Sequence, residues 1–163
     1  MDVIWLVKAI PLFGLSCWML LAAANNLLDP NTNITLLHRM MSMQALQEDQ
    51  HLGQGLLHRA RAAQSAIPTL LKGIAIYQLI LALGMLLCSL LMLLLVVGIT
   101  PVATHTVLVL SALTMSGFMA MWLFFLVGGL WFGYWIKMGQ VQFVHLSLLM
   151  ISILFQILLV QGL

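Results

Sequence analysis

Charged side chains are scarce in this sequence. Asp, Glu, Lys and Arg together make up 6% of its 163 residues, whereas a typical soluble domain contains about 25%. Six basic and four acidic side chains are too few to cover the surface of a water-soluble globule of this size. Hydrophobic residues account for 63% of the chain, so the composition indicates an integral membrane protein.

The same scarcity excludes several other classes of protein. The net charge of +2 arises from few charges rather than from a basic surface, so the chain has no footprint for binding nucleic acid. Its two cysteines are too few for a disulfide framework or a zinc site. Both Cys17 and Cys88 lie in apolar runs, where we expect them to pack as small hydrophobic side chains.

Long apolar stretches are what the sequence has in place of charge. A transmembrane helix needs about 20 apolar residues, and four stretches qualify: 3–24, 69–98, 104–127 and 141–162. None of them contains Asp or Glu, so a carboxylate proton relay of the kind found in pumps has no residues to use. Lys8 interrupts the first stretch, and we expect its long side chain to reach back to the membrane interface.

The linker between the first two spans, residues 25–68, holds most of the charge. It begins with turn-forming polar residues, namely Asn25, Asn26, Asp29, Pro30 and Asn33. Thr32 or Asn33 is expected to cap a first amphipathic helix over residues 34–41, and residues 56–66 form a second amphipathic segment. Helices of this kind lie flat among lipid headgroups. The chain is therefore predicted to be all-α: one membrane domain over residues 1–163, a four-helix transmembrane bundle with an interfacial helical linker.

Polar and small residues within the spans are candidates for contacts between helices. Small side chains let helix backbones approach closely in lipid. The candidates for packing and for contacts with partner proteins are Gln78, Ala112, Ser116, Ala120, Gly129 and Gly133, the last two forming a GxxxG pattern. Aromatic rings followed by a cation are typical of a membrane interface, which makes Trp131, Tyr134, Trp135 and Lys137 predicted interface anchors.

Histidines leave a redox alternative open. A haem b between helices needs two histidines at one depth, and His105 and His145 open antiparallel spans, so they lie on opposite sides of the membrane. His145 could instead pair with His38 or His58 of the linker. The alternative function is therefore a haem b- or quinone-binding anchor with His38, His58 and His145 at its site.

The absence of intramembrane carboxylates favours a non-catalytic protein without a resident cofactor or metal. We expect an accessory or structural subunit that contacts membrane lipids and packs against other integral membrane proteins of a larger complex. A small-solute transporter is a third possibility, although the sequence lacks a pair of broken helices or a charge at the midplane.

Two segments resemble a bacterial family of predicted small integral membrane proteins, the domain-of-unknown-function 2165 family. After the first span the family has a paired Asn, an Asp, another Asn and a His, matched here by Asn25, Asn26, Asp29, Asn33 and His38. Residues 128–135, Gly-Gly-Leu-Trp-Phe-Gly-Tyr-Trp, are similar to the family's Gly-Gly-Glu-Trp-Phe-x-x-Trp. The resemblance covers most of the chain and implies four spans in a bacterial inner membrane, without an activity.

This sequence departs from the family at two acidic positions. Gln78 follows Tyr77 where the family typically has an acid, and Leu130 replaces the family's Glu. Any chemistry that these acids perform in relatives is then absent here, which favours a structural role. The resemblance also implies cytoplasmic termini with the linker outside, whereas the excess of Lys and Arg on the linker side predicts a cytoplasmic linker by the positive-inside rule.

Overall fold

The structure is a computed structural model that describes residues 3–49, 51–61, 64–99 and 101–161. Its elements in chain order are α1 (Val3–Leu28), α2 (Pro30–Met41), α3 (Gln44–Gln47), the 3-10 helices η1 (Gln54–Arg59) and η2 (Gln64–Ala66), α4 (Ile67–Val96), α5 (Thr104–Trp131), α6 (Tyr134–Lys137) and α7 (Gly139–Val160). The described residues contain no strand, which confirms the all-α prediction.

Four of these helices, α1, α4, α5 and α7, are long and apolar enough to cross a membrane. The shortest, α7, has 22 residues and therefore measures about 33 Å, close to the thickness of the hydrocarbon core. In lipid each backbone N–H and C=O must bond within its own segment, so these leucine-rich runs fold as helices. They extend past the predicted spans at the linker end, where α1 ends at Leu28 and α5 at Trp131.

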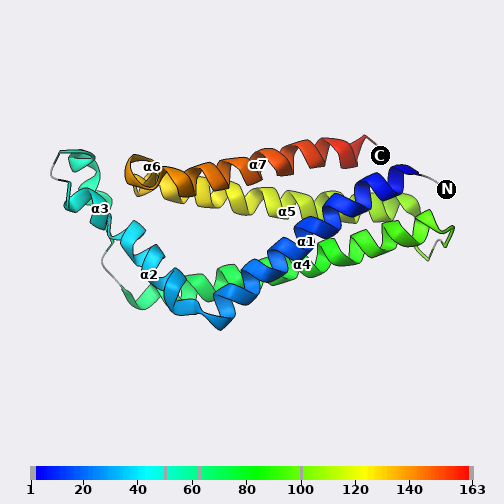
Figure 1. The fold of residues 1–163 in the computed structure, drawn as a ribbon, viewed down its shortest axis with the longest axis horizontal. Coiled ribbons are helices and arrows are strands. Elements are labelled where there is room, and N and C mark those ends of the chain that lie inside the picture. Colours follow the sequence, from blue (N-terminus) through cyan, green and yellow to red (C-terminus); the bar gives the residue numbers. More distant parts are fainter. Residues whose placement is uncertain (1–2, 50, 62–63, 100, 162–163) are drawn as a thin grey trace.

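The spanning helices form two pairs that lie side by side (Figure 1). Helix α1 packs along α4, α5 packs along α7, and the pairs join where α4 crosses α5. Both termini and the α4–α5 turn lie at one end of the molecule, and the linker and α6 lie at the other end. At the linker end α4 and α5 diverge, so the four helices do not close into a compact bundle there.

Two glycines lie in the contact between α4 and α5. A Cβ atom on Gly117 would lie 2.6 Å from Cδ2 of Leu81, and one on Gly84 would lie 2.8 Å from Cγ2 of Thr114. These separations are shorter than van der Waals contact, so a larger residue at either position would force these side chains to shift. Glycine at both positions lets side chains of the neighbouring helix pack against the helix backbone.

The Lys8 side chain is directed at the last turn of α7, and its expected reach to the membrane interface stays a prediction. Its side chain is 4% exposed, and its Nζ lies 3.4 Å from the carbonyl oxygen of Leu159 in the last turn of α7. Carbonyls of a last helical turn lack intrahelical partners and favour a nearby cation. Lys8 therefore links α1 to the last turn of α7.

The start of the linker differs from the prediction. Asn25 and Asn26 were expected in a turn, but both continue α1, and the chain breaks only at Asp29. Pro30 at the first position of α2 explains the break, because proline disfavours helical backbone at the residue before it. The expected cap at Thr32 or Asn33 is also wrong, since both lie inside α2, where Thr32 Oγ1 donates to Asp29 Oδ2 at 2.6 Å.

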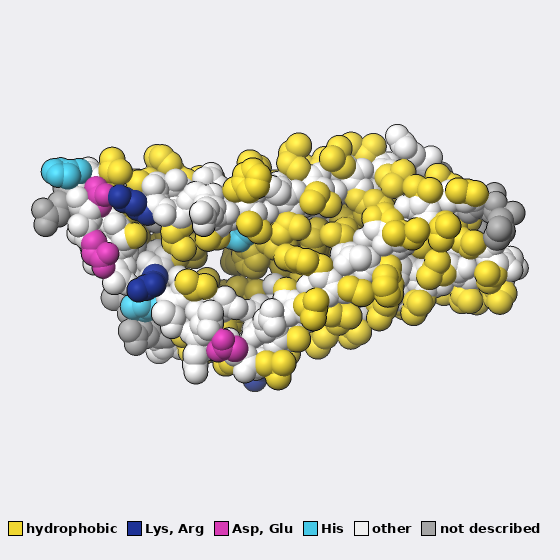
Figure 2. Space-filling model, viewed as in Figure 1, with side chains coloured by type: hydrophobic (Ala, Val, Ile, Leu, Met, Phe, Trp, Pro, Cys, Tyr) yellow, Lys and Arg dark blue, Asp and Glu magenta, His cyan; other side chains and the backbone are white. Residues whose placement is uncertain are grey.

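Residues 30–49 and 51–61 of the linker form a small head at one end of the membrane helices, where α3 contacts α6. The predicted helix over residues 56–66 is replaced by the short η1 and η2, and residues 62 and 63 lie outside the described residues. Asp49 pairs with Lys137 of α6, and the Arg59 guanidinium lies 4.7 Å from the centre of the Trp131 ring. Figure 2 shows the charged side chains gathered at this end.

Candidate functional site

Polar residues that are distant in sequence meet where α1, α2 and α4 converge. Asn26 Nδ2 donates to Gln78 Oε1 at 2.7 Å, and Asn33 Nδ2 donates to Asn26 Oδ1 at 2.6 Å. Gln78 is 5% exposed, so its amide needs a partner inside the helix pair. The chain of three amides holds the linker's first helix against the spanning pair, and it joins Gln78 to two of the predicted linker residues.

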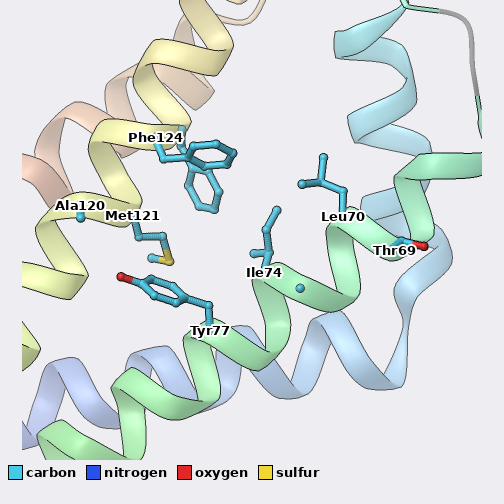
Figure 3. A pocket seen from close by; sticks show the side chains of 9 residues that line it. Thr69, Leu70, Ile74, Tyr77, Ala120, Met121 and Phe124 are labelled. Carbon is cyan, nitrogen blue, oxygen red and sulfur yellow. The ribbon is translucent and has the colours of Figure 1, made fainter.

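A groove opens between α4 and α5, on the linker side of the point where the two helices cross. It encloses about 500 Å³ and is lined by Thr69, Leu70, Gly73, Ile74, Tyr77, Ala120, Met121, Phe124 and Phe125. Figure 3 shows Leu70, Ile74 and Tyr77 of α4 facing Met121 and Phe124 of α5 across the cavity. The space-filling view is hollowed between the two helix pairs (Figure 2). Nearly all the walls are hydrocarbon or aromatic, so the groove suits an apolar guest.

The inner end of the groove is closed by a hydrogen bond between its walls. Tyr77 Oη donates to the carbonyl oxygen of Gly117 at 3.0 Å, one turn before Leu81 meets the same glycine. Phe124 remains 58% exposed and Tyr77 40% exposed, and both line the groove. These two large rings are therefore available to whatever occupies the space between the helices.

A cluster of four rings lies directly behind the groove. The His145 ring of α7 packs against Trp122 at 5.5 Å, Phe125 at 5.3 Å and Tyr134 at 5.9 Å between ring centroids. We call these four residues the aromatic cluster. Phe125 belongs to both features, because it lines the groove and touches His145. The aromatic cluster is thus one ring away from the cavity.

Three polar atoms of the aromatic cluster are buried without a hydrogen-bond partner among the described residues: Trp122 Nε1, Tyr134 Oη and His145 Nδ1. Trp122 is 3% exposed and Tyr134 2% exposed, so bulk water does not satisfy them. Burial raises the pKa of the Tyr134 phenol, which keeps its hydroxyl protonated and able to donate. Unpaired buried groups at this density are unusual in a folded protein and call for a ligand or an ordered water.

The GxxxG pattern serves a different purpose from the predicted helix contact. A Cβ atom on Gly129 would lie 2.5 Å from the Tyr134 ring, so the glycine makes room for that ring instead of for another helix. Gly133 has φ +64° and precedes α6, a left-handed backbone that favours glycine. Together they turn the chain after α5 and fold Tyr134 back under it. The sequence predicted that Tyr134 is an interface anchor, but its side chain is buried instead.

The other predicted packing and interface residues lie as follows. Ser116 Oγ accepts from Gln156 Nε2 of α7 at 3.2 Å, and Ala112 is buried. Ala120 lines the groove. Trp131 and Trp135 are about half exposed beside Lys137 at the linker end, a position that suits an interface. Contacts of these residues with partner proteins stay predictions.

The histidines proposed for a haem are placed in separate elements. His145 packs against rings from α5 and α6, whereas His58 lies in η1 with its Nδ1 3.0 Å from the Gly55 carbonyl oxygen. His38 lies in the last turn of α2. The residues that accompany His145, namely Trp122 and Phe125, were not found from the sequence. Trp122 and Phe125 are three residues apart, a spacing that puts two side chains on the same face of a helix. In a helix that is hydrophobic on every side, many other pairs have the same spacing, so it did not single out these two residues.

The family resemblance is confirmed. The sequence profile of the domain-of-unknown-function 2165 family, described as predicted small integral membrane proteins, matches residues 4–162, and the chain belongs to this family. No curated protein and no solved structure matches it.

Proposed function

We propose that this protein is a non-catalytic accessory subunit of a larger membrane assembly, and that it holds a lipid-like molecule in the groove between α4 and α5. The groove is the observation that supports a bound lipid-like molecule. Its volume of about 500 Å³ lies within the roughly 300–1,000 Å³ that is usual for small-molecule sites.

The dimensions favour a small amphiphile over a partner's transmembrane helix. On α4 the lining runs from Thr69 to Tyr77, which corresponds to about 12 Å along the axis. That length is less than half of the roughly 30 Å hydrocarbon core, and the Tyr77–Gly117 hydrogen bond closes the inner end. A helix crossing the whole membrane would need a groove that continues through both leaflets.

The outer helices supply the surface for partner proteins. Only 28% of the most apolar window of α1 and 22% of that of α7 are buried within the chain, against 39% for α4 and 44% for α5. The remaining apolar faces of α1 and α7 suit contacts with spanning helices of other membrane proteins. Gly14 of α1 has open space beside it, which permits close approach there.

The guest is tested by filling the groove. Ala120→Trp places a large ring in the cavity, whereas Leu123→Trp puts the same ring on α5 outside the lining residues and serves as the matched control. Lipid-like molecules that co-purify with the unmodified protein, extracted and identified by mass spectrometry, should be lost from the Ala120→Trp variant and kept in the Leu123→Trp variant. Equal retention by both variants contradicts a groove-bound guest.

The accessory role has a separate test. Blue-native electrophoresis after gentle extraction from native membranes should show the protein in a band larger than the monomer, together with other membrane proteins. A band at the size of an isolated monomer, with no co-migrating protein, rejects the role.

We further propose that the protein resides in a bacterial inner membrane with its linker head outside, as the family resemblance implies. Leu52 of the head is 50% exposed. A single-cysteine variant, Leu52→Cys combined with Cys17→Ala and Cys88→Ala, should react with a membrane-impermeant maleimide on intact spheroplasts. Reaction only after lysis establishes the opposite orientation.

A further inference from the structure

We infer that the groove's guest is an anionic phospholipid, with an acyl chain in the groove and its phosphate at the guanidinium of Arg59. The inference rests on the proposed groove function and names the class of lipid. It follows from the apolar surface that continues from the groove along α5, from the position of Arg59 at the end of that surface, and from the charges of the linker end.

An apolar track leads out of the groove along one face of α5. Ala120 and Phe124 line the cavity, and Figure 3 shows the Phe124 ring pointing into it. Val127 and Trp131 follow on the same face, because residues three or four positions apart on a helix lie above one another. Val127 is 66% exposed and Trp131 52% exposed. A Cβ atom on Gly128, beside them, would meet nothing within 4 Å among the described residues, so the track is open to a ligand.

The length of this track suits the acyl chain of one membrane leaflet. From Ala120 to Trp131 the helix axis rises about 16 Å, which is close to half of the roughly 30 Å hydrocarbon core. Trp131 is the last residue of α5, a position typical of tryptophans at the membrane interface. A chain that lies along the track, with its far end at the Tyr77–Gly117 hydrogen bond, therefore has its headgroup at the level of Trp131.

The guanidinium of Arg59 lies at this outer end of the track. It is 4.7 Å from the centre of the Trp131 ring, and its Nη1 donates to the Trp131 carbonyl oxygen at 3.4 Å. Contact with the ring face holds the cation in place, and no carboxylate in the described part of the chain forms an ion pair with it. Its Nε is buried, so the Nη atoms are the ones that a ligand reaches. A guanidinium is the side chain that best matches a phosphate group.

The charges of the linker end favour a negative headgroup. Residues 29–137 hold five basic and three acidic side chains, and Asp49 is already paired with Lys137, so cations remain in excess. Each Lys or Arg near the surface attracts anionic lipids, whereas the ammonium group of a zwitterionic head is repelled by these cations. The excess therefore favours a head such as phosphatidylglycerol.

The experiment uses the full chain in detergent micelles and measures lipid binding by native mass spectrometry. The probes are dioleoyl phosphatidylglycerol, dioleoyl phosphatidylethanolamine and dioleoylglycerol, which share their acyl chains and differ in the head. Arg59→Gln removes the cation and Arg59→Lys keeps it. Lys72→Gln is the matched control, because it removes one positive charge from the same end at an exposed position outside the groove lining.

Phosphate recognition predicts that Arg59→Gln weakens phosphatidylglycerol binding about fivefold, the effect of one cation near a membrane surface, and leaves dioleoylglycerol binding unchanged. Arg59→Lys should lose less than Arg59→Gln, and Lys72→Gln should change the affinity by less than about twofold. The unmodified protein should bind phosphatidylethanolamine more weakly than phosphatidylglycerol. Ala120→Trp, which fills the groove, should abolish binding of all three lipids.

The outcomes separate the two proposals. Equal losses of phosphatidylglycerol binding in Arg59→Gln and Lys72→Gln, with Ala120→Trp still blocking all three lipids, refute the headgroup site and keep the groove. If Arg59→Gln also loses dioleoylglycerol, the comparison moves to Arg59→Lys, where a phosphatidylglycerol affinity no higher than that for dioleoylglycerol refutes the headgroup site. Binding of none of the lipids to the unmodified protein overturns both the headgroup site and the groove.

Discussion

The amide chain that joins α1, α2 and α4 allows a quantitative prediction. Asn26 lies at its centre, because it donates to Gln78 at 2.7 Å and accepts from Asn33 at 2.6 Å. Side-chain hydrogen bonds in membrane proteins contribute about 0.6 kcal/mol on average and at most about 1.7 kcal/mol. Asn26→Ala loses two of them and should lower the free energy of unfolding by about 1.2–3.4 kcal/mol.

Three further variants make this figure testable. Asn33→Ala loses only one hydrogen bond, so it should cost about 0.6–1.7 kcal/mol, roughly half the effect of Asn26→Ala. Asn25→Ala is the matched control, because Asn25 is the neighbouring asparagine and is exposed; it should change stability by less than about 0.5 kcal/mol. A double-mutant cycle of Asn26→Ala with Gln78→Ala should show a coupling of about 0.6–1.7 kcal/mol.

The assay is equilibrium unfolding in mixed lipid–detergent micelles with increasing sodium dodecyl sulfate, followed by tryptophan fluorescence and helical circular dichroism. Coinciding curves from the two probes justify a two-state treatment. The reasoning is refuted if Asn26→Ala is no more destabilising than Asn25→Ala. A coupling energy near zero would likewise show that Asn26 and Gln78 do not interact.

Two other predictions concern the linker end. Gly129→Ala should destabilise the protein by about 1–3 kcal/mol, because its Cβ would lie 2.5 Å from the Tyr134 ring. Gly128→Ala is the control: its Cβ would meet nothing within 4 Å among the described residues, so it should be neutral or slightly stabilising. Equal melting temperatures of the two variants contradict the packing of Tyr134 against Gly129. The hydrogen bond from Lys137 holds the pKa of Asp49 below its ordinary 3.8, so their ion pair should persist above about pH 4 and be lost as pH falls through the lowered pKa, with protease cleavage of the head rising there. In Asp49→Asn that acid-dependent rise should disappear, and a rise that persists points to another group.

Composition and hydrophobic run length were enough to predict the membrane class, four spans and the all-α fold. Both are properties of single segments, because lipid requires every backbone group to bond within its own helix. Pro30 determines where α1 ends by the same local logic, although the prediction placed the break at the preceding asparagines. Those asparagines stayed helical because the end of a span tolerates an amide that finds a partner, as Asn26 does in Gln78.

The groove and the aromatic cluster depended on contacts between segments. A helix that is apolar on every side carries little information about which face meets a neighbour, so Trp122 and Phe125 could not be distinguished from other buried or lipid-facing rings. Gly84 of α4 packs against Thr114 of α5, and Gly117 of α5 packs against Leu81 of α4. Only the tertiary structure shows these two contacts.

The sequence by itself therefore determined that this chain belongs in lipid and that it crosses the membrane as helices, since scarce charge and long apolar runs act residue by residue. The tertiary structure decided which sides of those helices meet and where they separate. It also enclosed three polar atoms of Trp122, Tyr134 and His145 that have no hydrogen-bond partner within the described part of the chain. Hydrophobic burial has no direction in a uniformly apolar chain. Steric fit at a few glycines and the pairing of a few amides supply that direction.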